Sequence, residues 1–212
     1  MQQILYSSLI GYFLGCINPA YIISRFKGMD IRKHGSGNAG ASNALIVYGK
    51  AIGVVSALFD IFKAYFAYRI SVKLFPEVKG IGMVAGLFCI LGHIFPLFMG
   101  FRGGKGLACL GGMILAYDPK VFFVFLLCEL VIVLYVGYIC AVPVSASVAF
   151  TVYYAVVEQI PWVAVLSAAV SAIIILKHRE NFIRIKEGKE VKLSYLWNRE
   201  EEERRITENS DK

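Results

Sequence analysis

Residues 121–176, VFFVFLLCELVIVLYVGYICAVPVSASVAFTVYYAVVEQIPWVAVLSAAVSAIIIL, contain only two formally charged side chains, Glu129 and Glu158. In a soluble domain about a quarter of the residues are charged, so this stretch is unlike a soluble core. Only helices and closed barrels satisfy their backbone hydrogen bonds in lipid, and a helix crosses a bilayer with about 20 apolar residues. We therefore expect roughly three membrane-spanning helices in this stretch.

The rest of the chain has the same character. Of its 212 residues, 58% are hydrophobic and 17% are charged, and the mean hydropathy is +0.63. Seven apolar runs are candidate spans: residues 4–24, 51–68, 81–99, 107–117, 121–138, 143–157 and 162–176. The fourth run crosses only about half of a ~30 Å hydrocarbon core, at about 1.5 Å per residue. We predict an all-α polytopic membrane protein with about seven transmembrane helices; five or six spans with one re-entrant segment is the alternative.

The basic residues predict the orientation of these spans. In the seven-span arrangement 17 lysines and arginines lie in residues 25–50, 102–105 and from 177 onward, against four on the other side. The positive-inside rule places the amino terminus outside and the carboxyl terminus in the cytoplasm. The net charge of +7 is then explained by anionic lipid headgroups and anionic substrates, with no need for nucleic acid. We therefore expect the functional site on the cytoplasmic face of the membrane.

The chain is predicted to hold one functional domain. Residues 1–198 form the integral-membrane domain, and the hydrophilic tail 199–212 is expected to be disordered. The first run has no basic residues before it and no small-residue cleavage site, which indicates a retained helix. The cysteines lack CxxC spacing and are interpreted as small buried apolar residues; they are Cys16, Cys89, Cys109, Cys128 and Cys140. We expect neither a metal nor a cofactor.

Two glycine-rich basic loops are suited to phosphate. Residues 35–40, GSGNAG, fit GxGxxG, but a dinucleotide fingerprint must follow a strand, and this segment follows an apolar helix. Glycines still let backbone N–H groups approach an anion, and serine and asparagine add donors. Residues 102–106, RGGKG, lack the first glycine and the Ser/Thr of a P-loop, but Lys105 precedes an apolar helix and can meet phosphate there. A plain polar turn and a topology signal are the respective alternatives.

Further polar residues lie at the ends of spans or within them. His178, Asn181 and Arg184 recur at i, i+3 and i+6 and so share one helical face, although an ordinary interfacial helix end is the alternative. His93 precedes a proline kink and either faces a site or is satisfied inside the bundle. Asp60 and Lys63, spaced i, i+3 in the second run, are expected to form a structural ion pair.

Three stretches in this order resemble the bacterial membrane family of acyl-phosphate:glycerol-3-phosphate acyltransferases, PlsY. They are residues 35–43 (GSGNAGASN), 92–106 (GHIFPLFMGFRGGKG) and 177–184 (KHRENFIR), the last followed by Gly188 and Glu190. The resemblance extends over residues 1–197. Three positions depart from the usual family pattern: Ile46 replaces an arginine, Ala39 a proline and Ser42 a threonine. Whether Arg32, Lys33 or Lys50 compensates for Ile46 is left open.

The resemblance implies transfer of a fatty acyl group from a long-chain acyl phosphate to the 1-hydroxyl of glycerol-3-phosphate, giving lysophosphatidic acid and phosphate. Such chemistry needs positioning and charge stabilisation rather than a metal. Either His178 or a phosphate oxygen of the donor acts as base. The catalytic residues expected are His178, Ser36, Lys105 and Asn181. The substrate-binding residues expected are Gly37, Asn38, Gly40, Asn43, His93, Gly103, Gly104 and Arg184.

Other functions fit the sequence less well. No histidine has an aspartate five positions later, so the His-x4-Asp dyad of other glycerolipid acyltransferases is absent, and so is a GxSxG elbow. A transporter of a phosphorylated solute is the alternative function. It predicts inverted repeats and midplane polar groups in both halves, whereas the polar groups here concentrate at one face and no repeat is evident.

Overall fold

The structure is a computed structural model that describes residues 1–210. These residues form eleven α-helices and four short 3-10 helices, and no strand occurs among them. The α-helices are α1 (Gln2–Cys16), α2 (Pro19–Phe26), α3 (Ala41–Tyr48), α4 (Lys50–Leu74), α5 (Ile81–Ile94), α6 (Leu107–Tyr117), α7 (Pro119–Val136), α8 (Val142–Glu158), α9 (Pro161–Lys177), α10 (Arg179–Lys186) and α11 (Arg199–Ser210). The 3-10 helices are η1 (Ile31–Lys33), η2 (Leu97–Met99), η3 (Ile139–Ala141) and η4 (Leu193–Leu196). The all-α prediction is confirmed.

All seven apolar runs are helical, but they differ in their capacity to cross a membrane. Five helical segments are long and apolar enough, and α1 with α2 makes a sixth if this pair, bent by 40°, counts as one span. The remaining run is α6, which has 11 residues. Neighbouring helices shield α6, whose Gly112 packs directly against the backbone of Ile61 in α4. Length and composition therefore support five or six spans, with α6 as the short segment that the sequence singled out.

Small residues let the helices of the amino-terminal half approach closely. Gly11 and Gly15 on α1 face the backbone carbonyls of Ala85 and Cys89 on α5, where a Cβ atom on either glycine would overlap the carbonyl oxygen. Glycines spaced by four are a common contact between membrane helices, because backbone packing replaces the hydrophobic effect in lipid. By contrast, α7 has most of its apolar surface exposed, Cys128 included, as expected for a helix facing lipid.

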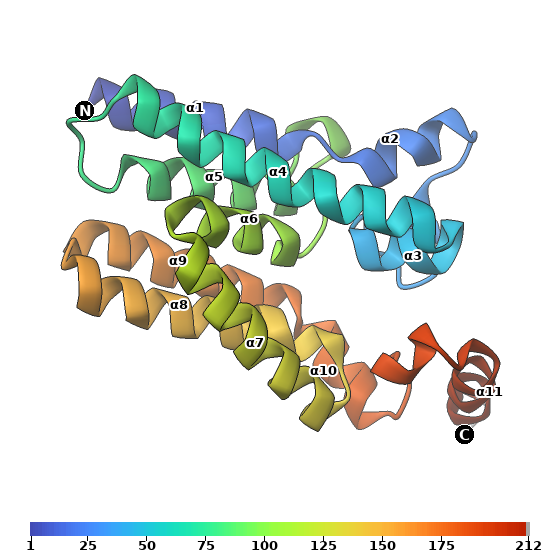
Figure 1. Cartoon of the computed structure of the whole chain (residues 1–212). Helices are drawn as coiled ribbons and strands as arrows, with labels where there is room; N and C mark the ends of the chain where they lie inside the picture. Colours follow the sequence, from blue (N-terminus) through green and yellow to red (C-terminus); the bar gives the residue numbers. More distant parts are fainter. Residues whose placement is uncertain (211–212) are drawn as a thin grey trace.

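The bundle gathers its polar connections at one end. Figure 1 shows α2, α3, α10 and α11 at the end opposite the amino terminus, and the chain ends there as well. The described chain therefore begins and finishes at opposite ends of the bundle. Which end faces the cytoplasm stays a prediction from the basic residues.

The carboxyl tail differs from the expectation of disorder. Arg199–Ser210 form the helix α11, and residues 211–212 lie outside the described residues. The helix carries ion pairs between Arg199 and Glu203 (2.7 Å) and between Arg205 and Glu202 (2.7 Å). Ion pairs at this spacing support a polar helix. Contacts with the preceding segment also hold this helix in place, and composition alone does not show them.

Candidate active site

The first glycine-rich loop is organised by the side chain of Asn43, which is completely buried in the first turn of α3. Its amide nitrogen donates to the carbonyl oxygens of His34 (2.9 Å) and Asn38 (2.7 Å), and also to that of Ile31 (3.1 Å). Its amide oxygen accepts from the N–H of Ser36 (2.7 Å). The buried amide of Asn43 therefore shapes the loop, and its predicted contact with substrate stays a prediction.

The tip of this loop is open. Ser36 and Gly37 are exposed, and Asn38 is half-buried beside them. Gly35 and Gly37 have φ values of +59° and +73°, a region that favours glycine. These residues are presented at the surface of the site, as binding to an anion requires. Their contacts with substrate stay predictions.

The two glycine-rich loops lie side by side. A Cβ atom on Gly40 would lie 3.9 Å from the Cα atom of Gly104. Arg32 bridges the loops, since its guanidinium donates to the carbonyl oxygen of Met99 (2.6 Å) while it pairs with Asp30 (2.8 Å). Arg32 lowers the pKa of Asp30 to about 2. Because this guanidinium already binds Asp30 and the carbonyl oxygen of Met99, Arg32 is poorly placed to take over the role of the family's usual arginine at the position of Ile46.

The second loop folds back over the end of α5. The N–H groups of Gly103 and Gly104 donate to the carbonyl oxygens of Ile94 (3.1 Å) and His93 (3.0 Å). Gly103 and Gly104 were expected to bind substrate, which stays a prediction, and their N–H groups are both used within the protein. A Cβ atom on Gly104 would overlap Nε2 of His93, so a glycine is required there for close packing.

Lys105 lies at the centre of the site. Its ammonium donates to Oδ1 of the buried Asn181, which joins the second loop to α10. Burial, and then the positive charge of Arg184, lower the pKa of Lys105 below its usual value. Within residues 1–210 the N–H groups of Lys105 and Gly106 have no partner, and they stand at the start of α6. A cation beside unpaired N–H groups at a helix start is a favourable place for phosphate.

The third stretch supplies a base, an amide and a second cation. His178 ends α9, and its Nδ1 lies 2.8 Å from the carbonyl oxygen of Ile174. In this geometry Nδ1–H donates, and in the neutral ring Nε2 carries the lone pair. Asn181 and Arg184 lie on α10, and the carboxylate of Glu190, in the segment after α10, accepts from the amide nitrogen of Asn181 (2.6 Å) and from Nε of Arg184 (2.6 Å). Sequence reasoning gave Glu190 no role, because only the turn at Gly188 brings its carboxylate back against α10.

His93 has a different position from the one expected for a substrate ligand. It is 3% exposed and lies in a buried cluster with Asp60 and Lys63. The predicted ion pair between Asp60 and Lys63 forms at 2.7 Å, and Nδ1 of His93 lies 3.1 Å from the Lys63 nitrogen. Lys63 also donates to the carbonyl oxygens at the break between α1 and α2, those of Gly15 (3.0 Å) and Ile17 (2.7 Å). The cluster therefore supports both this break and the second loop.

This cluster also contains the residues of the chain's described part that could hold a metal. Ligand atoms of Asp60, His93 and Cys109 lie within 4.8 Å of one another. The Lys63 ammonium, however, lies 2.7 Å from Asp60 and supplies a positive charge at this point. A cation and a lysine ammonium would compete for one carboxylate, so we assign the cluster to structural support.

Replacing Lys63 with methionine is expected to lower the free energy of unfolding by about 3–5 kcal/mol, because the buried Asp60 would lose its counter-charge. Thermal unfolding in detergent measures the change. Lys73→Met, at an exposed position of the same helix, is the control and is expected to cost less than about 0.5 kcal/mol. Adding Asp60→Asn to Lys63→Met is expected to recover part of the loss. Equal stability of the two lysine variants would show that the cluster does not support the fold.

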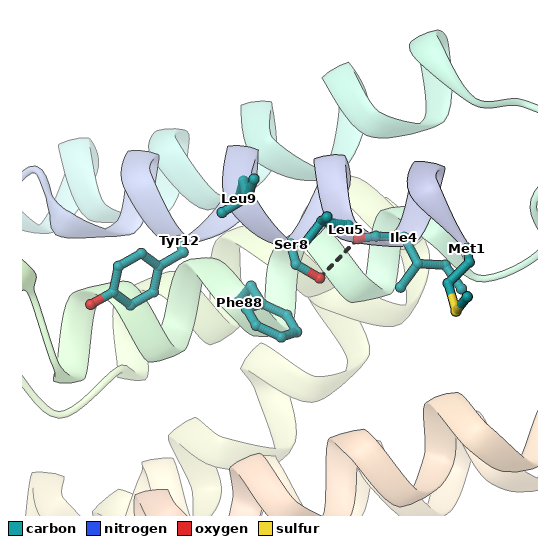
Figure 2. A pocket seen from close by; sticks show the side chains of 7 residues that line it. All are labelled: Met1, Ile4, Leu5, Ser8, Leu9, Tyr12 and Phe88. Carbon is teal, nitrogen blue, oxygen red and sulfur yellow. Dashed lines mark hydrogen bonds between the residues drawn. The ribbon is translucent and has the colours of Figure 1, made fainter.

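An apolar groove lies along the amino-terminal part of α1. Figure 2 shows the residues that line it, which are Met1, Ile4, Leu5, Ser8, Leu9, Tyr12 and Phe88. At its inner end, the Tyr12 hydroxyl donates to the carbonyl oxygen of Phe95 (2.8 Å). Phe95 directly follows Ile94, whose carbonyl oxygen holds the second loop. The groove thus runs along the helices toward the site.

The three sequence stretches meet in one place. Gly40 and Gly104 join the first two loops, and Lys105 and Asn181 join the second loop to α10. The meeting point combines an exposed serine loop, a half-buried ammonium, an amide and an imidazole at one end of an apolar bundle. Such a set can neutralise phosphate, stabilise a developing oxyanion and accept a proton.

Comparison with known proteins agrees with this site. A sequence model of the family described as glycerol-3-phosphate acyltransferase matches residues 5–188. The glycerol-3-phosphate acyltransferase of Thermosipho melanesiensis is 37% identical over 199 residues, which cover 92% of this chain and 95% of that protein.

Two solved structures are also similar. The crystal structure of PlsY, an integral membrane glycerol 3-phosphate acyltransferase, in its glycerol 3-phosphate form has a TM-score of 0.82 and 33% identity, covering 91% of this chain and 96% of that one. The lysophosphatidic acid form has a TM-score of 0.78, with the same identity and coverage. The bundle, its three motifs and these relatives agree, and the chain belongs to the glycerol-3-phosphate acyltransferase family.

Proposed function

We propose that this chain transfers a fatty acyl group from acyl phosphate to the 1-hydroxyl of glycerol-3-phosphate, producing lysophosphatidic acid and phosphate for phospholipid synthesis in bacteria. The observation that carries the proposal is the contact of Lys105 with Asn181 beside the open first loop, at one end of an apolar bundle. Both substrates carry a phosphate, and the site presents phosphate-binding groups on two adjacent loops. The similar PlsY structures, one described as a glycerol 3-phosphate form and the other as a lysophosphatidic acid form, add support.

The reaction balances without a cofactor or a metal. The hydroxyl oxygen of glycerol-3-phosphate attacks the carbonyl carbon of the mixed anhydride and forms the ester bond, and the carbon–oxygen bond to phosphate breaks. The hydroxyl proton passes either to Nε2 of His178 or to a phosphate oxygen of the donor. Because phosphate is a good leaving group, the protein contributes mainly position and charge.

Each part of the site has a role in this proposal. The first loop, through Ser36, Gly37, Asn38 and Gly40, contacts phosphate and carbonyl oxygens. Lys105 and the N–H groups at the start of α6 neutralise phosphate, and Asn181 orients the lysine. Arg184 adds a second cation. Gly103, Gly104, His93 and Asn43 act on substrate indirectly, because the structure uses them to hold the two loops in place.

The acyl tail is proposed to stay in an apolar environment while the head group reaches the site. The groove of Figure 2 leads along α1 toward the second loop and suits such a chain. We propose the cytoplasmic face of the inner membrane as the location of the site, since the basic residues concentrate around the loops.

The donor class tests the proposal directly. The purified protein in detergent is expected to release phosphate from palmitoyl phosphate and to form lysophosphatidic acid, and both products should depend on added glycerol-3-phosphate. Palmitoyl-coenzyme A at the same concentration is the matched donor control and is expected to give no product. Transfer from the coenzyme A ester alone would overturn the choice of donor. Absence of any acylated product would overturn the enzyme assignment for this chain and favour the alternative function, a transporter of a phosphorylated solute.

A further inference from the structure

The carboxyl-terminal helix α11 lies outside the stretch that matches the family model, which ends at residue 188. In the structure this helix is attached to the segment that follows α10. The guanidinium of Arg205 donates to the backbone carbonyl oxygens of Gly188 and Glu190, the latter at 2.7 Å. Figure 1 shows α11 at the same end of the molecule as α10. The helix therefore contacts the backbone that carries the Glu190 carboxylate.

Glu190 connects this attachment to Lys105. One carboxylate oxygen accepts from the amide of Asn181 (2.6 Å), and the other accepts from Nε of Arg184 (2.6 Å). Asn181 then accepts from the Lys105 ammonium with its own oxygen. All of these bonds are made by buried or half-buried groups, so a shift of Glu190 is transmitted to the lysine.

We propose that α11 is a positioning element of the active site: Arg205 fixes the backbone at Glu190, and Glu190 orients Asn181 and Arg184 beside Lys105. The inference rests on the proposed acyl transfer, since the rate of that reaction is what it predicts. It assigns a role to a segment whose composition indicates a dispensable tail.

The packing of α11 shows that Arg205 is held in this arrangement. The carboxylate of Glu202 is buried, pairs with Arg205 (2.7 Å) and accepts from the hydroxyl of Ser194 (2.8 Å). On the other side, the N–H groups of residues 189 and 190 donate to the carbonyl oxygen of Arg184 (2.8 and 3.1 Å). The segment that carries Glu190 is thus held by α10 and α11 together. Arg204, by contrast, is exposed and its nearest ion pair, with Glu208, is 3.9 Å long.

Neighbouring arginines on α11 provide the test in the full-length chain. Arg205→Ala is expected to lower kcat for acyl transfer by about tenfold to 100-fold, because displacement of groups that position a reaction is costly even when its cause is distant. Arg204→Ala is the matched control and is expected to keep kcat within about twofold, as a surface substitution does. Size-exclusion chromatography and thermal unfolding establish that both variants are folded. Equal kcat values for folded Arg205→Ala and Arg204→Ala would overturn the proposal.

A double-mutant cycle separates positioning through Glu190 from general support of the fold. In a Glu190→Gln background, Arg205→Ala is expected to lower kcat by less than about twofold further, since both changes act on one path. Independent losses that multiply in the double variant would overturn the path through Glu190. Should Arg205→Ala not fold, Arg205→Lys against Arg204→Lys decides by the same criterion. An inactive unmodified protein would contradict the proposed reaction, whereas an active protein that is insensitive to Arg205 would contradict only the role of α11.

Discussion

His178→Ala is expected to lower kcat by about 10²- to 10⁴-fold, the usual loss when a positioned general base is removed. The bond between Nδ1 and the carbonyl oxygen of Ile174 (2.8 Å) fixes the ring and leaves Nε2 as the acceptor. The residue is buried at the end of α9, next to the helix that carries Asn181. Steady-state rates of acyl transfer at saturating glycerol-3-phosphate measure the effect.

The exposed His34 at this end of the bundle supplies the control. His34 is exposed in the first loop, where only its backbone takes part in the loop's hydrogen bonds. His34→Ala is therefore expected to retain kcat within about threefold, as a surface change does. If His178→Ala kept near-normal turnover, the proton would instead pass to a phosphate oxygen of the donor, and His178 would lose its role as base.

The helical fold and the grouping of the motifs were predictable from sequence for a simple reason. Apolar runs of sufficient length must be helices in lipid, and the number of runs between two loops decides whether they share a face. The loops at residues 35–43 and 102–106 and the stretch at 177–184 are separated by even numbers of runs. Their contacts, Gly40 with Gly104 and Lys105 with Asn181, agree with that expectation.

The partners of individual side chains were not predictable in the same way. Asn43, His93, Gly103 and Gly104 were assigned to substrate from their motifs, yet each is used to hold a loop. A motif shows which residues gather at a site, but which of them point outward depends on hydrogen bonds between distant segments. The shielding of α6 by α4 was unpredictable for a related reason, because it depends on a contact between two helices and not on the 11 residues of the run itself.

The tail shows a further limit of composition. Residues 199–210 are highly charged, and charge-rich segments with few apolar residues are usually disordered. Here two arginine–glutamate pairs and the bonds from Arg205 to the backbone near Glu190 hold the segment as a helix. The pairing of Arg205 with the buried Glu202 outweighs the general tendency to disorder, and composition alone does not reveal it.

Lys105→Ala is expected to lower kcat/KM by about 10²- to 10³-fold, the loss typical of removing one preorganised donor to a developing charge. Lys105 is the ammonium that bonds Asn181, and its loss also leaves that buried amide oxygen without its donor. Rates of acyl transfer and calorimetric binding of glycerol-3-phosphate measure the change. Lys186→Ala, at an exposed position of α10, is the control and is expected to behave as the unmodified protein does. Unchanged binding of glycerol-3-phosphate to Lys105→Ala would contradict the assignment of this lysine to that phosphate.

The pH dependence of the rate tests the charge of Lys105 separately from its size. The ammonium is present below its pKa, and burial, followed by the positive charge of Arg184, lowers that pKa from the ordinary value of 10.5. Activity is therefore expected to fall at alkaline pH with a midpoint below 10.5. In Lys105→Arg the guanidinium stays charged throughout this range, so whatever activity remains should lose the alkaline fall. An identical alkaline midpoint in both proteins would show that another group titrates, and Lys105 would then act by shape rather than by its positive charge.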